Sequence, residues 1–448
     1  MAQGQSVLER ITGWLSAREL AILFIAAPLF LFVRPSFALV LLLPPLLWLA
    51  RRHSRGHFVP RTPVDWSVLG LMTMALFSIF VTPDFSFSYR KVVGLVYGVA
   101  VFYGIVDWGQ QRRTILPTEA LVGGLGSMAA LLALLGTEWV FKLPVLDRAV
   151  SEMPAVIRGL PGAEAGFNPN QVAGALIMFI PLQAMMFWDA VTSSRRGEGR
   201  HIGLAVGAGL ALALTSSVVL VAQSRASWAA LLLGLLGMCA LVFRRFRIFL
   251  VLLVAAGVVV VAILWPMGAG AWLAQQAWTV SPGETSWAAR VELWSQGLWT
   301  IADYPLTGTG MNFFRRIAGR SLPLYHFEYG QDVGHSHQAY VQVALDLGLP
   351  GLVAYLALLF GLVASGWQTY KKSSGRFTRH MALAGVTGIV IHTIWGFADA
   401  IALGAKQSFL WWSVLALVAT VVIHNRRGDR GTPIPGSSPA KTWERASK

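Results

Sequence analysis

The chain has 448 residues, of which 55% are hydrophobic and only 13% charged, and its mean hydropathy is +0.59. Soluble domains carry about a quarter charged residues, so this composition excludes an ordinary soluble protein and predicts an all-α integral membrane protein. The net charge of +15 is typical of basic cytoplasmic loops, whereas a nucleic-acid-binding role is disfavoured because no basic stripe alternates with aromatic residues on a soluble unit.

Apolar runs bounded by charged or turn residues follow one another along the chain and predict about twelve transmembrane helices. They lie near 19–33, 36–50, 64–81, 91–107, 115–136, 169–189, 202–221, 227–243, 248–266, 350–368, 380–398 and 408–424. The first two are short for a crossing of roughly 20 residues and could form a shallow hairpin instead. No cleavable signal peptide is expected, because the first run lacks a small-residue cleavage site.

The positions of lysine and arginine indicate which side each loop faces. With the N-terminus inside, 24 of these residues fall in inner segments and 12 in outer ones, which accounts for all 36. Short inner loops such as RRHSRGHFVPR and FRRFR are strongly basic. The bias predicts that both termini are cytoplasmic.

Two segments differ from the short loops between the runs. Residues 267–336, between the ninth and tenth predicted spans, form an outer loop far beyond the roughly 15 residues above which connections are uncommon and often functional. Residues 426–448 are rich in proline, glycine, serine and basic residues, and we expect a disordered cytoplasmic tail. Residues 1–425 are then one polytopic membrane domain.

The long outer loop is predicted to contain a helix. Ser281, Pro282 and Glu284 form a capping box with proline at the first helical position. Tyr304 and Pro305 end the helix. Apolar side chains follow at helical spacing at Trp287, Val291, Trp294, Leu298 and Ala302. The tryptophans favour a position near the lipid headgroups.

Few polar groups lie inside the predicted spans. His392 is the one titratable residue well within a span, whereas proton-coupled transporters usually carry intramembrane carboxylates or broken helices in paired halves. The one cysteine, Cys239, lies in an apolar run, so neither a disulfide nor a thiolate metal site is expected. Candidate functional groups therefore lie in the outer loops.

Arginines near the outer ends of the spans are candidate anion ligands. Ser224 is a plausible N-cap that places Arg225 in the first turn of a span, where a cation opposes the helix dipole unless an anion lies between it and the backbone N–H groups. A guanidinium reaching the lipid headgroups is an equally good interpretation. Arg290 follows Trp287 by one turn and alone is typical of an interfacial anchor, but two arginines together could bind a pyrophosphate. Arg90 and Lys91 are weaker candidates.

Two histidines precede the tenth span. Ser336 is expected to cap a helix that begins at His337 and runs to about Leu347, before a break at Gly348. In the first turn the helix dipole would favour the neutral imidazole that a general base needs, although a simple polar cap is the more economical interpretation. His335 and His337 are two residues apart with no carboxylate–histidine pattern around them, so we expect no metal site and no cofactor.

These residues together resemble the O-antigen ligase family, within the superfamily that also holds O-antigen polymerases and bacterial protein O-oligosaccharyltransferases. The likeness rests on SRAS (Arg225), WAARVELWSQGLWTIADYPLTGTGMNFF (Arg290) and HSHQAYVQVALDLGLPG (His337), and on their order around one long late loop. The motifs cover residues 222–351, and the architecture covers most of the chain.

The resemblance implies a GT-C-like glycosyltransferase of the bacterial inner membrane, with its active site on the periplasmic face. Arg225 and Arg290 would bind the pyrophosphate of an undecaprenyl-pyrophosphate-linked polysaccharide. His337 would activate a hydroxyl on the outer core of lipid A-core, with His335 as a rival, in a metal-independent and inverting transfer. Membrane lipids would be the other partners.

The chain also departs from the family pattern. The family usually has asparagine directly after the histidine, where this chain has Gln338, and often glutamate where this chain has Asp346. The stretch NPNQVAG is family-like, and Asn170 is a further candidate for the site.

Other functions remain open from the sequence. A polymerase that extends lipid-linked repeats would use the same donor, and a protein O-glycosylating enzyme is disfavoured because no large soluble C-terminal domain follows. A transporter of lipid-linked sugars would show paired halves and a polar central cavity, and neither is evident. A non-catalytic membrane scaffold is the least favoured function, because it would not explain the cluster of His and Arg residues on the outer side.

Overall fold

The computed structural model describes residues 6–32, 35–139, 150, 156–159, 166–194, 202–264, 287–318, 324–327 and 333–429. Within these ranges the chain is almost wholly helical, and its β pairing there is a single isolated bridge between Thr137 and Phe167. The prediction of an all-α protein is therefore confirmed for this part of the chain.

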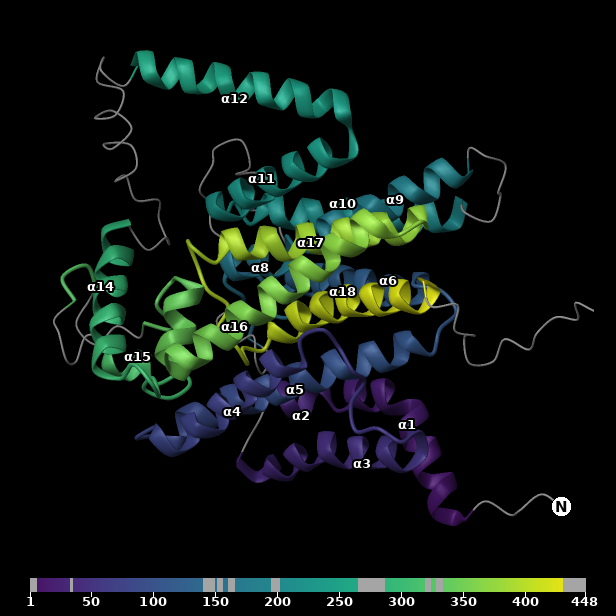
Figure 1. Ribbon diagram of the computed structural model, residues 1–448. Coiled ribbons are helices and arrows are strands. Elements are labelled where there is room, and N and C mark those ends of the chain that lie inside the picture. The colour runs from purple at the N-terminus through teal and green to yellow at the C-terminus, as the bar shows by residue number, and fades with distance from the viewer. Residues whose placement is uncertain are drawn as a thin grey trace, which may run out of the picture.

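Figure 1 shows the described helices with their labels. In chain order they are α1 (Val7–Ile25), α2 (Ala27–Leu31), the 3-10 helix η1 (Pro35–Leu42), α3 (Leu43–Arg55), α4 (Asp65–Val81), α5 (Phe85–Gln110), α6 (Leu116–Gly136), α8 (Pro169–Leu176), α9 (Ile180–Ser194), α10 (Ile202–Val221), α11 (Arg225–Val242), α12 (Arg244–Leu264), α14 (Trp287–Asp303), α15 (Phe314–Ile317), α16 (Ala339–Lys372), α17 (Arg376–Trp395) and α18 (Ser408–Asp429).

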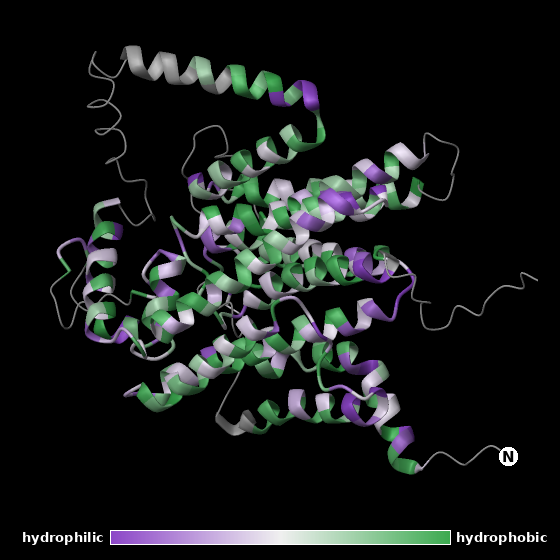
Figure 2. Cartoon of the chain, in the orientation of Figure 1, coloured by the Kyte–Doolittle hydropathy of each residue, from purple (hydrophilic) through white to green (hydrophobic). Residues whose placement is uncertain are grey.

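Among the described residues, six helices are long and apolar enough to cross a membrane, namely α5, α6, α10, α11, α16 and α18. The pair α8 and α9, bent by 42° at a short break, makes a seventh if it is counted as one span. Hydrophobic residues run along these helices, and hydrophilic residues gather toward their ends (Figure 2). The fold is consistent with an integral membrane protein, and the number of twelve spans stays a prediction.

Helices α5 and α18 form the centre of the bundle. Both are buried over most of their length, and the rings of Phe102 on α5 and Trp412 on α18 meet at 5.8 Å. Helices α16 and α17 pack against α18, and α11 packs against α17. The N-terminus and the C-terminal end of α18 lie at one end of the bundle, and α14 and α15 lie at the other (Figure 1).

Helix α14 confirms the predicted loop helix, while the predicted capping residues 281–284 lie outside the described part of the chain. Its buried face contains Leu293 and Gly297, which pack against Val341 and Leu345 of α16. The predicted apolar stripe is on the other face, where the side chain of Leu298 is 59% exposed. The stripe is therefore available to lipid, as an interfacial helix would require.

Helix α16 contains the predicted break. Gly348 has φ 69° and ψ 178°, outside the helical region, and Pro350 follows it. A Cβ at Gly348 would collide with the carbonyl oxygen of Leu306, so the part of the long loop that follows α14 lies directly against the kink. The N–H of Leu349 donates to the Pro305 carbonyl at 2.7 Å, and the N–H of Thr309 to the Leu345 carbonyl at 2.8 Å. The loop is thereby fixed to the helix that follows it.

Helix α18 continues to Asp429, past the predicted start of the tail at 426. Residues 430–448 lie outside the described residues, so the disordered tail stays a prediction.

Candidate functional site

The histidine segment lies at the start of α16, but not where the sequence places it. Helix α16 begins at Ala339 and its N-cap is Gln338, whose side-chain oxygen accepts from the N–H of Val341 at 2.6 Å. The prediction that Ser336 caps the helix is wrong. Ser336 is buried, and its own N–H donates to the side chain of Gln342 at 2.8 Å. His337 therefore precedes the helix, with φ 51°.

His337 is paired with a buried carboxylate. Its Nδ1 lies 3.1 Å from Oδ1 of Asp399, which follows the end of α17. Burial raises the pKa of Asp399, but the hydrogen bond and charge of His337, with smaller contributions from His335 and the N–H of Ala400, outweigh it and hold the pKa at about 2. An ionised Asp399 accepts the Nδ1 proton of His337, so the proton-accepting nitrogen of the neutral ring is Nε2.

Hydrogen bonds between α16 and α17 hold this pair in place. The N–H of Ala339 donates to the Gly396 carbonyl at 2.8 Å, and the hydroxyl of Tyr340 donates to the Thr393 carbonyl at 2.7 Å. His337 and Asp399 thus lie next to the ends of two helices that are joined by direct hydrogen bonds, and these bonds favour a rigid geometry of the pair.

His335 has different surroundings. Its Nδ1 lies 3.2 Å from the N–H of His337, and its Nε2 lies 2.9 Å from the side-chain amide of Gln171 and 3.9 Å from Asp399. Burial lowers the pKa of His335 to about 4, helped by the charge of His337 and opposed by Asp399. His337 makes the closer contact with Asp399, at 3.1 Å against 3.9 Å for His335. This contact favours His337 over His335 as the residue that the carboxylate orients.

Two of the predicted cations converge on the histidines. The charges of Lys91 on α5 and Arg290 on α14 both act on His335 and lower its pKa. Lys91 also interacts electrostatically with Asp346 and Lys406, and the Nε of Arg290 is buried with no hydrogen-bond partner among the described residues. Two cations therefore lie within electrostatic range of His335, where they could balance the charge of an anionic ligand.

The other predicted cations lie at helix starts. Helix α11 begins at Arg225 with Ser224 at the N-cap, as predicted, and the side chain of Arg225 is exposed. Arg90 is also exposed, near the start of α5. Neither is among the charges that act most strongly on His335. Lys91 is thus better placed than its neighbour Arg90.

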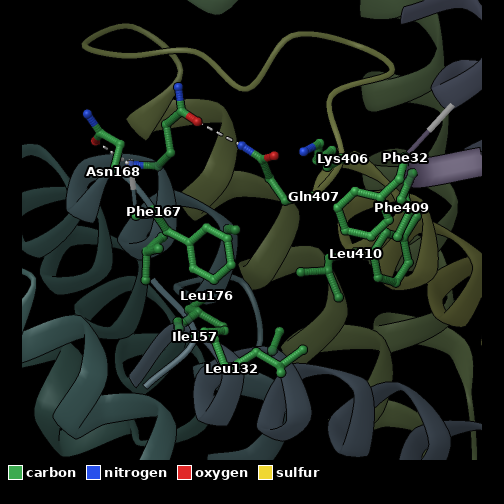
Figure 3. Close-up of a pocket in the computed structure, with 17 residues that line it drawn as sticks. Phe32, Leu132, Ile157, Phe167, Asn168, Leu176, Lys406, Gln407, Phe409 and Leu410 are labelled. Atoms are coloured by element: carbon green, nitrogen blue, oxygen red, sulfur yellow. Dashed lines mark hydrogen bonds between the residues drawn. The ribbon is translucent and has the colours of Figure 1, made fainter. Parts of the chain in front are cut away.

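A glutamine that the sequence does not single out contacts the site. Asn168 caps α8 by accepting from the N–H groups of Asn170 and Gln171. The Gln171 side chain contacts His335 and accepts from the side-chain amide of Gln407 at 2.9 Å (Figure 3). The predicted candidate Asn170 is one position away. The NPNQ motif therefore lies at the site, and a role for Asn170 itself stays a prediction.

Asp346, where the family pattern often has glutamate, is connected to the histidine segment through hydrogen bonds. Its Oδ1 accepts from the side chain of Gln342 at 2.9 Å and from the N–H of Asn312 at 3.0 Å. Gln342 in turn accepts from the N–H of Ser336, and the Asn312 side chain donates to the Phe87 carbonyl at 3.2 Å. This chain of hydrogen bonds connects the histidine segment to the long loop and to α5.

The histidines and Asp399 also have the composition of a cation site. Ligand atoms of His335, His337 and Asp399 all lie within 4.8 Å of one another, although the sequence predicts no metal. A cation bound there would engage the carboxylate that now accepts from His337. Asp399 therefore either accepts the hydrogen bond of His337 or binds a cation. Activity measured with and without a chelator distinguishes the two arrangements.

Comparison with known proteins identifies a family for part of the chain. Residues 210–356 match the family described as O-Antigen ligase, which confirms the resemblance noted from the motifs. The matched segment includes Arg225, Arg290 and His337, and it ends before Asp399. No curated protein matches the chain.

Proposed function

We propose that this chain, whose residues 210–356 match the O-antigen ligase family, transfers O-antigen polysaccharide from undecaprenyl pyrophosphate to an outer-core sugar of lipid A-core. The family covers ligases and polymerases, so an enzyme acting on a lipid-linked polysaccharide is the common ground. The observation that carries the proposal is the His337–Asp399 hydrogen bond, with Lys91 and Arg290 in electrostatic range of the adjacent His335. It supports His337 as the base and the two cations as phosphate ligands.

The reaction is a single displacement. Nε2 of His337 takes the proton of the acceptor hydroxyl while that oxygen attacks the anomeric carbon from the side opposite the phosphate. The bond between the anomeric carbon and the phosphate oxygen breaks, and undecaprenyl pyrophosphate leaves with the electron pair. The configuration at that carbon inverts. Asp399 holds the imidazole in the required tautomer and stabilises the imidazolium that forms.

The cations act on the leaving group. Negative charge grows on the pyrophosphate as the bond to the sugar breaks, so donors fixed beside it stabilise the transition state more than the ground state. Arg290 can bind two phosphate oxygens at once, and Lys91 adds a point charge. Arg225 at the start of α11 remains part of the proposed phosphate site. With these side chains balancing the charge, the transfer is proposed to need no metal.

The location is proposed to be the periplasmic face of a bacterial inner membrane, with both termini cytoplasmic. Two observations support it: the basic bias of the predicted inner loops, and the placement of α14 at the end of the bundle opposite both described chain ends (Figure 1).

The test is reconstitution of the purified protein with lipid-linked O-antigen and rough lipopolysaccharide in the presence of EDTA, read as a ladder on a gel. We expect a ladder on lipid A-core that disappears in His337→Ala. The control is His326→Ala, because His326 lies in the same long loop but bonds to Glu292, away from the pair. Normal activity in His337→Ala would eliminate it as the base.

Other outcomes point to other functions. Longer chains on the carrier lipid, with none on lipid A-core, would identify a polymerase. Activity lost in EDTA and restored by a divalent cation would mean that the histidines and Asp399 bind a metal. Intact donor with no covalent product would favour a transporter.

A further inference from the structure

An apolar pocket opens beside the site. It has a volume of about 560 Å³ and lies between α2, α6, α8 and α18. Its walls include Leu132, Phe167, Leu176, Phe409 and Leu410, and the polar side chains lie together along one edge (Figure 3). This combination of apolar walls and a few grouped polar atoms is typical of a ligand site.

The polar edge connects the pocket to the histidines. Gln171 and Gln407 are hydrogen bonded across it, and Gln171 contacts His335 on its other side. Lys406 lies on the same edge, with its ammonium 4.7 Å from the ring centroid of Phe32. A molecule that fills the pocket would therefore have its polar end beside the histidines.

The backbone before α18 places Lys406 there. Gly404 has φ 77°, and a Cβ at this position would collide with the carbonyl oxygen of Lys91 on α5. The turn therefore lies directly on α5, which brings Lys406 into electrostatic range of Lys91. Lys406 on the pocket edge and Lys91, which acts on His335, are thus in electrostatic range of one another.

We propose that this pocket holds the isoprene units nearest the phosphate of a polyprenyl pyrophosphate, and that Lys406 binds the pyrophosphate. The identity of the lipid rests on the proposed function. A ligand with an apolar chain and an anionic head matches an apolar cavity that has Lys406 and two glutamines along its polar edge. The cavity is too small for the whole carrier chain, and Leu132 is 49% exposed at its wall, so the remaining isoprene units extend into the bilayer.

This placement gives the two substrates separate routes. The donor enters from the lipid through the side of α6, its phosphate stops at Lys406 and the Gln171–Gln407 pair, and its first sugar reaches His337. The acceptor then approaches from the side of α14. Recognition of the donor lipid is thereby separate from recognition of the acceptor sugar.

Photolabelling tests the pocket without requiring turnover. The probe is a polyprenyl pyrophosphate with a diazirine in an isoprene unit near the phosphate, added to the full-length protein in liposomes. We expect labelled peptides from the pocket walls on α6, α8 and α18. Excess undecaprenyl pyrophosphate should displace the probe, whereas phosphatidylglycerol should not. Equal displacement by phosphatidylglycerol would mean a general lipid groove and would overturn the proposal.

A matched pair of variants adds a second test. Leu131 and Leu132 are neighbours on α6 and are 48% and 49% exposed, but of the two Leu132 lines the pocket. Leu132→Trp should lower labelling and raise the KM for a long-chain donor by roughly tenfold, a change of about 1.4 kcal/mol, while sparing a short-prenyl donor. Leu131→Trp should change neither. Lys406→Gln should weaken both donors, and Lys406→Arg should restore binding.

The outcomes separate this proposal from the proposed function. Labelled walls in a protein that forms no glycosidic product would support the lipid site and reject the ligase. Ligation without labelled walls, with Leu131→Trp and Leu132→Trp behaving alike, would reject the lipid site and leave the ligase.

Discussion

At the level of single residues, two histidines in one short segment have different environments. His337 faces an ionised carboxylate through Nδ1, whereas His335 has partners at both ring nitrogens. The close contact with Asp399 supports the proposed role of His337 as base. The resemblance already favours His337 with His335 as a rival, but the contacts with Gln171 and Asp399 could not be predicted, because those residues come from other segments of the chain.

The first prediction concerns Asp399. Asp399→Asn removes the charge that stabilises protonated His337 and lets the ring adopt the wrong tautomer. We expect kcat to fall about a hundredfold or more, within the range of general-base contributions, with little change in donor binding. Initial rates and donor titration measure the two effects. Asp303→Asn is the control, because Asp303 is exposed on α14. A rate unchanged by Asp399→Asn would leave the carboxylate no role in proton transfer.

The second prediction concerns pH. His335 has a pKa of about 4 in the fold against an ordinary value of 6.5, so the unfolded chain binds this proton first as the pH falls. The free energy of unfolding is therefore highest above pH 6.5 as far as His335 is concerned, and it falls as the pH drops from 6.5 toward 4. Between pH 7 and pH 5 the expected loss is about 2 kcal/mol. Asp399 acts in a lower window, between 3.8 and about 2.

Thermal unfolding in detergent at several pH values measures this effect. His335→Gln removes the titrating ring while the neighbouring charges of Asp399, Lys91 and Arg290 remain. We therefore expect the variant to lose less stability than the original protein between neutral and mildly acidic pH. Parallel curves for the two proteins would show that other groups dominate.

At the level of elements, helix ends with local signals were predictable. The end of α14 before Tyr304 and the break at Gly348 follow from proline and glycine. Helix α11 begins at Arg225 as predicted, although the Ser224 side chain makes no capping hydrogen bond. The start of α16 was not predictable, because serine at 336 is preferred over glutamine at 338 as an N-cap. Ser336 is instead held by Gln342, and Gln338 takes the cap.

Helix α14 shows another limit of local patterns. Periodicity predicted the helix but not its packing face, because Leu293 and Gly297 pack against α16 while Trp287, Val291 and Leu298 of the predicted stripe are exposed. A stripe of large apolar residues indicates the core only when no lipid competes for it.

The third prediction concerns the kink in α16. Alanine at Gly348 must adopt a positive φ, at a cost of about 1–2 kcal/mol, and its Cβ meets the loop at Leu306. We expect a lower Tm and reduced activity, because the histidine segment is held by the same loop. Gly207→Ala on α10, where a Cβ meets nothing, should not lower the Tm. Equal Tm values for the two variants would mean that the kink tolerates a side chain.

At the level of the whole molecule, much of the candidate site was beyond prediction from the sequence. Arg290 and His337 stand out through motifs and resemblance, and Lys91 through its place at the end of an apolar run. Gln171 and Asp399 come from segments on either side of the family match, and the packing of α17 against both α8 and α16 brings them to the histidines.

The fourth prediction concerns topology. In a Cys239→Ala background, Tyr325→Cys should react with a membrane-impermeant maleimide on intact spheroplasts, because Tyr325 is 84% exposed in the long loop. Thr114→Cys, between α5 and α6, should react only after permeabilisation. The opposite pattern would invert the proposed orientation.

The distance along the chain between His337 and Asp399, 62 residues, has a consequence for the order of biosynthesis. Chains emerge from the ribosome N-terminus first, so the histidine segment is made before α17, Asp399 and Gln407. A nascent chain that already contains the whole segment matched by the family still lacks the carboxylate that pairs with His337. If the proposed function holds, such a chain is inactive until α17 and Asp399 have been added and packed against α16.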